Sequence, residues 1–250
     1  MISVPWYEAM DHDPLWWAKS YPYQIPNRSY VLADGGYEEL PEGGPLPDLS
    51  GRQPVLACGS NQSPERLARK LAGFIDRPVP VIRARVTGFD AVYSVHFSTS
   101  GSIPATLHQA PGATASLFVN WLTPAQQQRL HETEAVGRNY DFGRLDGIQV
   151  RLDGGGVLTH AFAYVSRHGC LIDDDAPVAL AAVPATGRRW PALTEEQVLA
   201  LARDRLAPGR PLDDFIRETI FQEKTRLART ATLKSDGRPF SYGGFTPVAV

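Results

Sequence analysis

Cysteine and methionine are scarce in this chain of 250 residues, which has two of each. Cys58 and Cys170 form no C-x-x-C pair, so neither a zinc site nor a disulfide framework is indicated. The net charge is only −2, which speaks against a bulk attraction to nucleic acid. No hydrophobic run approaches the ~18 residues of a membrane span, and the N-terminus lacks the basic and apolar regions of a secretory signal. We therefore expect a cytoplasmic protein without nucleic-acid or membrane partners.

Glycine and proline are plentiful, with 22 and 21 residues, and hydrophobic residues make up 43% of the chain. This composition is typical of a globular protein with a core and many turns. Residues 1–53 hold three of the five tryptophans, among them Trp6, and five of the nine tyrosines. We interpret them as an irregular arm that packs its aromatic side chains onto a main domain at 54–180, with a binding lid as the alternative. A helical extension and tail are expected over 181–250.

The main domain opens on a short apolar run, Val55 to Cys58, which predicts a buried strand. Gly59 then indicates a tight turn, because glycine adopts backbone conformations that side chains forbid. A helix is expected to start at Pro64, with Ser63 as its N-cap. Such a turn can direct backbone N–H groups at an anion, although an ordinary turn that binds nothing is the alternative.

Further along, the pattern predicts mixed strands and few helices, which indicates an α+β domain or a small closed barrel. Thr123 and Gln126 form a capping-box pattern around Pro124. Gly88 and the pair Pro111-Gly112 are typical turn residues, so we expect strands to end there. Expected strands cover 79–86, 91–97, 104–107, 116–122 and a hairpin of 148–152 with 157–165; expected helices cover 64–72, 124–134, the segment after Thr194 and 213–230.

Glu134 is the candidate base. It lies four residues after Leu130, so the two side chains share a face of the expected helix. Since Leu130 should face the core, we expect Glu134 to be partly buried, whereas Glu132 should be solvated. A partly desolvated carboxylate is a better base near neutral pH than a solvated one. A helix-end glutamate that is only a surface charge is the alternative.

Residues 54–166 resemble the gamma-glutamylcyclotransferase-like family in the order and spacing of several short motifs. The family's Tyr-Gly-Ser-Asn after a strand is matched by Cys58-Gly59-Ser60-Asn61, and its Leu-Asp-x-x-Glu helix end by Leu130 to Glu134. The other matches are Leu67 and Leu71, Gly88-Phe89-Asp90, Ala105-Thr106-Leu107, Pro111-Gly112, Tyr140 and the hairpin. The resemblance implies a small mixed β-barrel with flanking helices.

The resemblance also implies a reaction. The α-amino group of a γ-glutamyl amide attacks its own γ-carbonyl, forms 5-oxoproline and expels an amine, without metal or cofactor. Glu134 matches the general acid/base. Positions in or beside the substrate loop are matched by Cys58, Gly59, Ser60, Asn61 and Gln62, with Tyr140 as a further substrate contact. The implied partner is a small γ-glutamyl amine or peptide; the oligomeric state stays open.

Two positions depart from the family pattern. Cys58 replaces a tyrosine and loses its hydroxyl, and His131 replaces an aspartate on what we expect to be an exposed face. The flanking segments exceed the compact family domain, so they are expected to cover the mouth of the site and to select a larger leaving amine.

Three alternatives remain. Cys58 could be the nucleophile of an amidohydrolase, activated by His96, His108, His131 or His160. A metal could be bound by Asp11-His12-Asp13 or Asp173-Asp174-Asp175, although adjacent acids are usually solvated. The domain could also be a non-catalytic module of the same fold that binds a small molecule.

Overall fold

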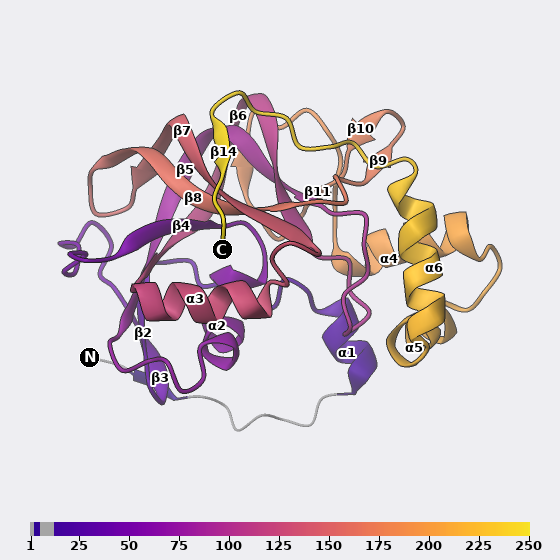
Figure 1. Cartoon of the computed structure of the whole chain (residues 1–250), viewed down its shortest axis with the longest axis horizontal. Helices are drawn as coiled ribbons and strands as arrows, with labels where there is room; N and C mark the ends of the chain where they lie inside the picture. The colour runs from indigo at the N-terminus through magenta and orange to yellow at the C-terminus, as the bar shows by residue number, and fades with distance from the viewer. Residues whose placement is uncertain (1–2, 6–12) are drawn as a thin grey trace.

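A closed five-stranded barrel forms the centre of the molecule. In the computed structural model, which describes residues 3–5 and 13–250, each barrel strand pairs with the next and the last pairs with the first. Among the pairs that close the barrel, only that of β4 and β8 is parallel, so the barrel is mixed, as predicted (Figure 1). The barrel order is β5 (Val79–Tyr93), β6 (Ala105–Leu122), β4 (Gln53–Ala57), β8 (Val157–Ser166) and β7 (Tyr140–Leu152).

Two predicted strand ends are wrong. β5 continues through Gly88 and β6 through Pro111 and Gly112, with a shift of register between Thr87 and Phe89. Gly88 and Gly112 have φ of 82° and 85°. A bulge with glycine in this conformation bends a strand without ending it, which a closing barrel requires. The turn signals therefore mark bends inside two long strands.

The arm is mostly irregular, as predicted, but it also extends the sheet. Its regular elements are β1 (Ser3–Pro5), α1 (Pro14–Lys19), β2 (Tyr30–Ala33) and β3 (Gly36–Glu39). β2 pairs with the start of β5, and β3 pairs with both β2 and β1. The arm therefore joins the barrel through backbone pairing as well as through aromatic packing.

Three short helical elements lie on one side of the barrel: η1 (Ser60–Gln62), α2 (Pro64–Lys70) and α3 (Pro124–Thr133). Leu67 and Leu130 are fully buried in a cluster between these helices and the outer face of the barrel. The predicted capping box of Thr123 and Gln126 is confirmed. Ser63 precedes α2, but its hydroxyl makes no capping hydrogen bond, so that detail of the prediction is wrong.

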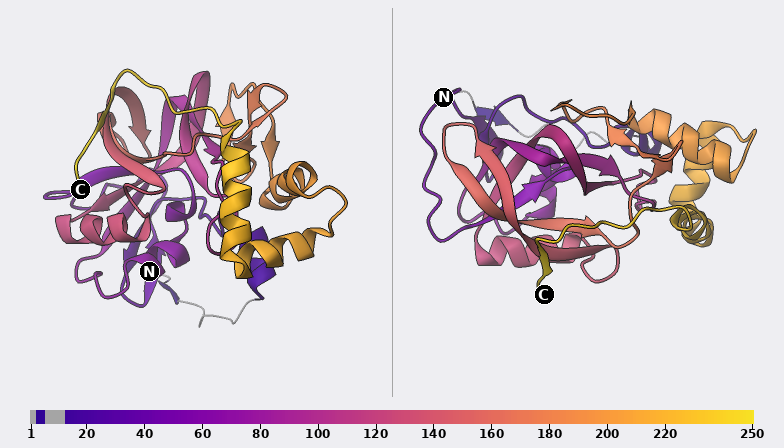
Figure 2. Two further views of the ribbon diagram at one scale, coloured as in Figure 1. Left: turned by 45° about the vertical axis from the view of Figure 1, so that its right-hand side comes forward. Right: turned by 90° about the horizontal axis from the view of Figure 1, so that it is seen from above.

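The C-terminal segment places α4 (Glu195–Leu206), α5 (Leu212–Phe221) and α6 (Glu223–Lys234) together at one end of the barrel (Figure 2). The prediction of a single helix over 213–230 is wrong. Gln222 has extended backbone angles, which separate α5 from α6. Arg226 donates to the carbonyls of Thr219 and Ile220, which satisfies acceptors at the broken end. Five short strands precede the helices: β9 (Ile172–Asp173), β10 (Ala176–Pro177), β11 (Ala179–Leu180), β12 (Ala185–Thr186) and β13 (Ala192–Leu193).

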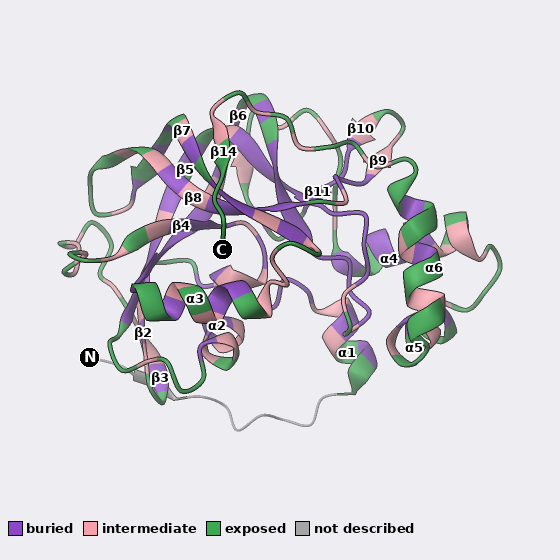
Figure 3. Cartoon of the chain, viewed as in Figure 1, coloured by how far each residue is buried: buried purple, intermediate pink, exposed green. Residues whose placement is uncertain are grey.

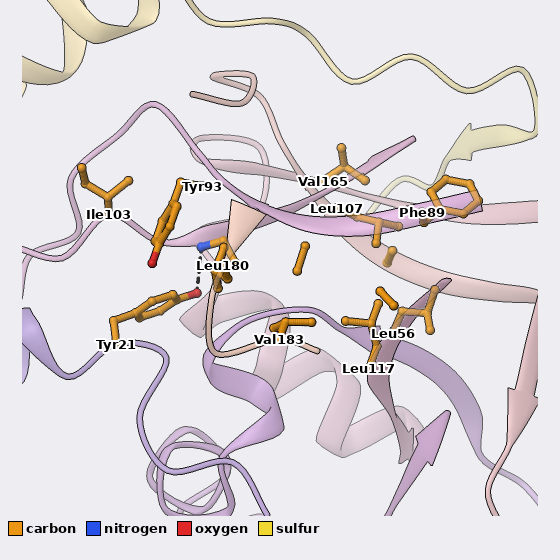
Figure 4. Close-up of a cluster of buried hydrophobic side chains, with 14 of the residues drawn as sticks. Tyr21, Leu56, Phe89, Tyr93, Ile103, Leu107, Leu117, Val165, Leu180 and Val183 are labelled. Carbon is orange, nitrogen blue, oxygen red and sulfur yellow. Dashed lines mark hydrogen bonds between the residues drawn. The ribbon is translucent and has the colours of Figure 1, made fainter. Parts of the chain in front are cut away.

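The last segment is more ordered than the predicted tail, since α6 reaches Lys234 and β14 (Phe245–Pro247) pairs with β7. Buried residues run continuously from the barrel interior to the C-terminal helices (Figure 3). Figure 4 shows part of this cluster, with the Tyr21 ring reaching into it from the arm. Across the described residues, every helix is too short or too polar to traverse a lipid bilayer.

Candidate active site

A cavity of about 300 Å³ lies where the turn after β4 meets the end of α3. It is lined by residues from the arm, α2, the loop between β5 and β6, and the segment that follows α3. Five of the predicted site residues contribute to its wall together with the candidate base: Cys58, Gly59, Ser60, Asn61, Tyr140 and Glu134. The structure thus brings together two sequence motifs that are more than seventy residues apart.

Glu134 caps the C-terminal end of α3 and lines the cavity. Its side chain is 11% exposed, in agreement with the expected partial burial, whereas Glu132 is exposed and pairs with Arg129. The helix stops here because the next residue, Ala135, has a left-handed φ of 50°. The carboxylate therefore sits at the end of a fixed helix and faces a cavity.

Two donors reach the same oxygen of this carboxylate. Lys70 Nζ lies 2.6 Å from Glu134 Oε1, and Asn61 Nδ2 lies 3.0 Å from it. Lys70 also donates to Asn61 Oδ1 at 2.8 Å, so the three side chains close a triangle. Both donors fix the orientation of the carboxylate. Because both converge on Oε1, the second oxygen, Oε2, is the one available to a ligand.

The turn before α2 has less free backbone than its sequence suggests. The N–H groups of Gln62 and Ser63 donate to the carbonyls of Gly59 and Ser60 inside the 3-10 turn. The N–H groups of Ser60 and Asn61 are therefore the ones left for an anion. The carbonyl of Asn61 accepts from the buried Asn120 at 3.1 Å, which fixes the turn to β6.

Gly59 is needed for space at this turn. Its φ of −135° is not left-handed, while its ψ of −134° lies outside the ranges that residues with side chains usually adopt. A Cβ at this position would lie 2.1 Å from the Tyr21 hydroxyl and 2.9 Å from Ala105 Cβ. The absence of a side chain lets the arm approach the turn.

Two tyrosines meet at the backbone of Ala105. The Tyr21 hydroxyl accepts from the Ala105 N–H at 2.8 Å, the dashed line in Figure 4, and the Tyr140 hydroxyl donates to the Ala105 carbonyl at 3.0 Å. Burial raises the pKa of both phenols well above the usual range, so both stay protonated at neutral pH. The two rings are thus rigid parts of the cavity wall.

Gln62 is the one predicted site residue that lies outside the cavity lining. It is 1% exposed, and its side-chain amide donates to the Gly59 carbonyl at 3.3 Å. The 3-10 turn rotates it into the protein, so Gln62 supports the turn from behind instead of facing a ligand.

The environment of Cys58 does not favour a nucleophile. Burial, with a smaller contribution from Glu134, raises the pKa of its thiol to about 12. Of the four candidate histidines, His96 alone lines the same cavity. Burial lowers the pKa of His96 to about 3, and its Nδ1 hydrogen bonds to Ser94 at 2.7 Å. A thiol that stays protonated lacks the reactive thiolate.

His131 does not lie on an exposed face, contrary to the expectation. It is 7% exposed, its Nδ1 lies 2.9 Å from the Tyr164 hydroxyl, and its ring packs edge-on against Phe142. It therefore fastens α3 to the barrel. The described residues contain no group of three His, Cys, Asp or Glu side chains placed to hold a metal, and Asp11 and His12 lie outside them.

The cavity residues that the sequence does not predict include Lys70, Arg66 and Tyr21. Lys70 and Arg66 are four residues apart on α2, and they flank the buried Leu67. Helical spacing after the Gly59 turn could have placed them on one face beside the turn. Tyr21 carries no comparable signal, because it arrives from an irregular segment.

No protein-family model and no curated protein matches the chain. Among solved structures it is similar to one titled "Gamma-glutamyl cyclotransferase", at 16% identity over 77% of this chain and 92% of that one, with a TM-score of 0.38. It is also similar to a protein of Arabidopsis thaliana solved in solution (15% identity, 63% and 87% coverage, TM-score 0.38). A third is an uncharacterized protein from Homo sapiens (16% identity, 78% and 93% coverage, TM-score 0.38). The chain thus matches in structure, at low identity, a protein that bears the name of the family its sequence resembles.

Proposed function

We propose that the protein is an enzyme that releases 5-oxoproline and a free amine from a γ-glutamyl amide, with Glu134 as general acid and base. The observation that carries the proposal is the pairing of Glu134 with Asn61 at 3.0 Å in the wall of a cavity. The sequence resemblance assigns these two positions to the base and the substrate loop, and the fold brings them into contact.

The reaction needs orientation more than it needs a reactive side chain. The nucleophile is the substrate's own α-amino group, and a well-placed intramolecular attack reaches effective molarities of about 10⁵–10⁸ M. The protein then has to hold the glutamyl part, take protons from the α-ammonium and return protons to the leaving nitrogen. The described lining of the cavity offers groups for each of these tasks.

In the proposed sequence, the α-ammonium donates a proton to Glu134 Oε2, the oxygen that Lys70 and Asn61 leave open. The free amine attacks the γ-carbonyl carbon, and the carbonyl electron pair moves to oxygen. Glu134 passes the first proton to the leaving nitrogen, the oxygen electron pair re-forms the carbonyl, and the old C–N bond breaks. The freed Glu134 carboxylate then takes the second proton from the new C–N⁺ centre and passes it to the departing amine, which leaves as an ammonium.

The N–H groups of Ser60 and Asn61 are proposed to hold the α-carboxylate or the developing oxyanion. Tyr140 lines the same cavity and, because its phenol stays protonated, it acts as part of the wall rather than as a base. The Tyr21 phenol beside Gly59 offers, from the arm, a hydroxyl near the position at which Cys58 lacks one.

A panel of γ-glutamyl amides tests the proposal with the full-length protein, with 5-oxoproline measured by chromatography. Release from at least one amide, lost in Glu134→Gln, supports it. If some of these amides bind and none is turned over, the protein is a binding module of this fold and the proposal is wrong.

A further inference from the structure

The cavity contains more positive than negative charge. Its charged lining residues are Arg66, Lys70, Arg138 and Glu134, that is, three cations and one carboxylate. Lys70 is paired with Glu134. In the described part of the chain, neither arginine lies within 4 Å of a carboxylate oxygen. Since Arg138 is exposed and Arg66 is half-buried, Arg66 is the unpaired cation inside the cavity.

Arg66 is held in place by aromatic rings rather than by an acid. Its guanidinium carbon lies 4.6 Å from the centre of the Tyr23 ring and 5.2 Å from that of Trp17. Tyr23 adopts a left-handed φ of 72°, an uncommon conformation for a residue of this size. Stacking occupies the faces of the guanidinium and leaves its N–H edge open. Its Nε is buried with no hydrogen-bond partner in the described structure.

Three serine hydroxyls line the same cavity from the loop between β5 and β6. Ser98 Oγ lies 2.7 Å from Ser102 Oγ and 2.9 Å from Ser100 Oγ, and the ring closes at 3.3 Å. The half-buried Ser98 and Ser100 can rotate their hydroxyls to donate to a ligand, whereas Ser102 is buried. Hydroxyl donors and a stacked guanidinium that line the same cavity form a site that suits an anionic group.

The serine loop is fixed by parts of the chain outside the barrel. A Cβ on Gly101 would lie 2.7 Å from Ile220 of α5, and the N–H of Ile103 donates to Glu195 of α4 at 2.6 Å. The arm supplies Tyr23 to the same wall. Two segments that flank the barrel therefore build the wall in which Arg66 sits.

We propose that Arg66, with Ser98 and Ser100, forms a subsite for an acidic group, a carboxylate or a phosphate, carried by the amine that the reaction releases. The inference rests on the proposed function. Arg66 lies one helical turn before Lys70, which pairs with Glu134. A γ-glutamyl amide bound beside Glu134 therefore places at Arg66 an acidic group that lies a few bonds beyond its leaving nitrogen. The subsite selects γ-glutamyl amides of acidic amines over neutral amines of equal length.

Three amides with the same two-carbon spacer test the subsite: γ-glutamyl-β-alanine, γ-glutamyl-O-phosphoethanolamine and γ-glutamyl-propylamine. We expect the native protein to prefer at least one acidic amide over the propylamide by about ten- to a hundredfold in kcat/KM. Arg66→Met should lose that preference, so that its kcat/KM for the acidic amides falls to about its value for the propylamide. The two acidic arms distinguish a carboxylate from a phosphate as the preferred group.

Arg69→Met is the matched control, because Arg69 lies on the same helix, stacks on the same Trp17 ring and is exposed outside the cavity. It should leave the preference intact. If Arg66→Met fails to fold, as judged by thermal melting, Ser100→Ala replaces it and should reduce the preference about threefold or more. Equal turnover of acidic and neutral amides by the native protein overturns the subsite and leaves the proposed function standing.

A binding measurement decides the case in which no amide is turned over, which would refute the proposed function. β-Alanine, O-phosphoethanolamine and propylamine are titrated by calorimetry into the native protein and Arg66→Met. Binding of an acidic amine that Arg66→Met abolishes supports an acid subsite. Equal titrations of acidic and neutral amines, or titrations that the variant does not change, overturn it.

Discussion

Lys70 Nζ lies 2.6 Å from Glu134 Oε1, and both side chains are largely buried, 16% and 11% exposed. The pair joins the last turn of α2 to the residue that ends α3, and Asn61 bonds to both partners from the turn after β4. The carboxylate is thus held by donors from two separate elements. This arrangement leaves Glu134 one open oxygen and fixes the direction in which it faces the cavity.

Replacement of Lys70 by Met should lower kcat/KM for 5-oxoproline release at least tenfold, because Glu134 loses its cation and its orientation. The free energy of unfolding should fall by about 1–3 kcal/mol, the cost of a largely buried charge left without its partner. Lys70→Arg should recover part of the turnover, and the pH–rate profile of Lys70→Met should differ from that of the native protein. Full turnover with an unchanged profile in Lys70→Met would show that the ion pair is only structural.

Gly59→Ala should destabilise the protein by about 1–3 kcal/mol, because the new methyl group meets the Tyr21 hydroxyl and Ala105. Tyr21→Phe removes the nearer of these atoms, so the double variant should lose less stability than the two single losses combined. Gly243→Ala is the control, since a Cβ there would have no atom within 4 Å and its φ is not left-handed. Denaturant melts of the four proteins give the coupling; additive losses would contradict the proposed contact.

Cys58 should react slowly with iodoacetamide at pH 7.5, because its thiol pKa of about 12 leaves almost no thiolate. The rate should rise about tenfold per pH unit and level off only near pH 12, and it should also rise when the protein unfolds. Cys58→Ala should keep 5-oxoproline release. Mass spectrometry of the labelled peptide measures the rate of alkylation. Rapid labelling of Cys58, together with loss of turnover in Cys58→Ala, would restore the amidohydrolase alternative.

His96 should make stability depend on pH in the acid range. Burial, with a smaller effect of His168, lowers the pKa of His96 to about 3, so in the folded protein it stays neutral well below the pKa of an unfolded histidine, ~6.5. The unfolded state therefore binds the proton first as the pH falls. This one group should reduce the free energy of unfolding by about 1.4 kcal/mol per pH unit between roughly pH 6.5 and 3.

Urea denaturation of the native protein and His96→Gln at several pH values isolates this contribution. The difference between the two curves should shrink as the pH falls below ~6.5. A difference that stays constant from pH 7 to pH 4 would contradict a buried neutral His96.

The local parts of the fold could be predicted because their signals are local. Thr123 with Gln126 starts α3, and the four-residue spacing of Leu130 and Glu134 predicts the buried carboxylate at its end. Gly88 and Pro111 mislead because the same residues serve turns and bulges, and only barrel closure decides between the two.

The rest of the candidate site depends on how separate elements pack. Lys70 and Arg66 reach the cavity only because Leu67 between them docks α2 on the barrel. Tyr21 comes from the irregular arm, and it can approach the turn only because Gly59 has no side chain. Gln62 fails as a predicted contact because the 3-10 turn points it inward. Apart from the helical spacing of Arg66 and Lys70, neighbours along the chain carry no signal for such contacts.

The role of Glu134 is measured by 5-oxoproline release from the same panel of γ-glutamyl amides by the native protein, Glu134→Gln and Glu132→Gln. Glu132 is the matched control, because it lies two residues away in α3 and is exposed outside the cavity. We predict release by the native protein and by Glu132→Gln, and a loss of at least a hundredfold in Glu134→Gln, about the contribution of a general acid and base. Release by Glu134→Gln at the native rate would contradict the account.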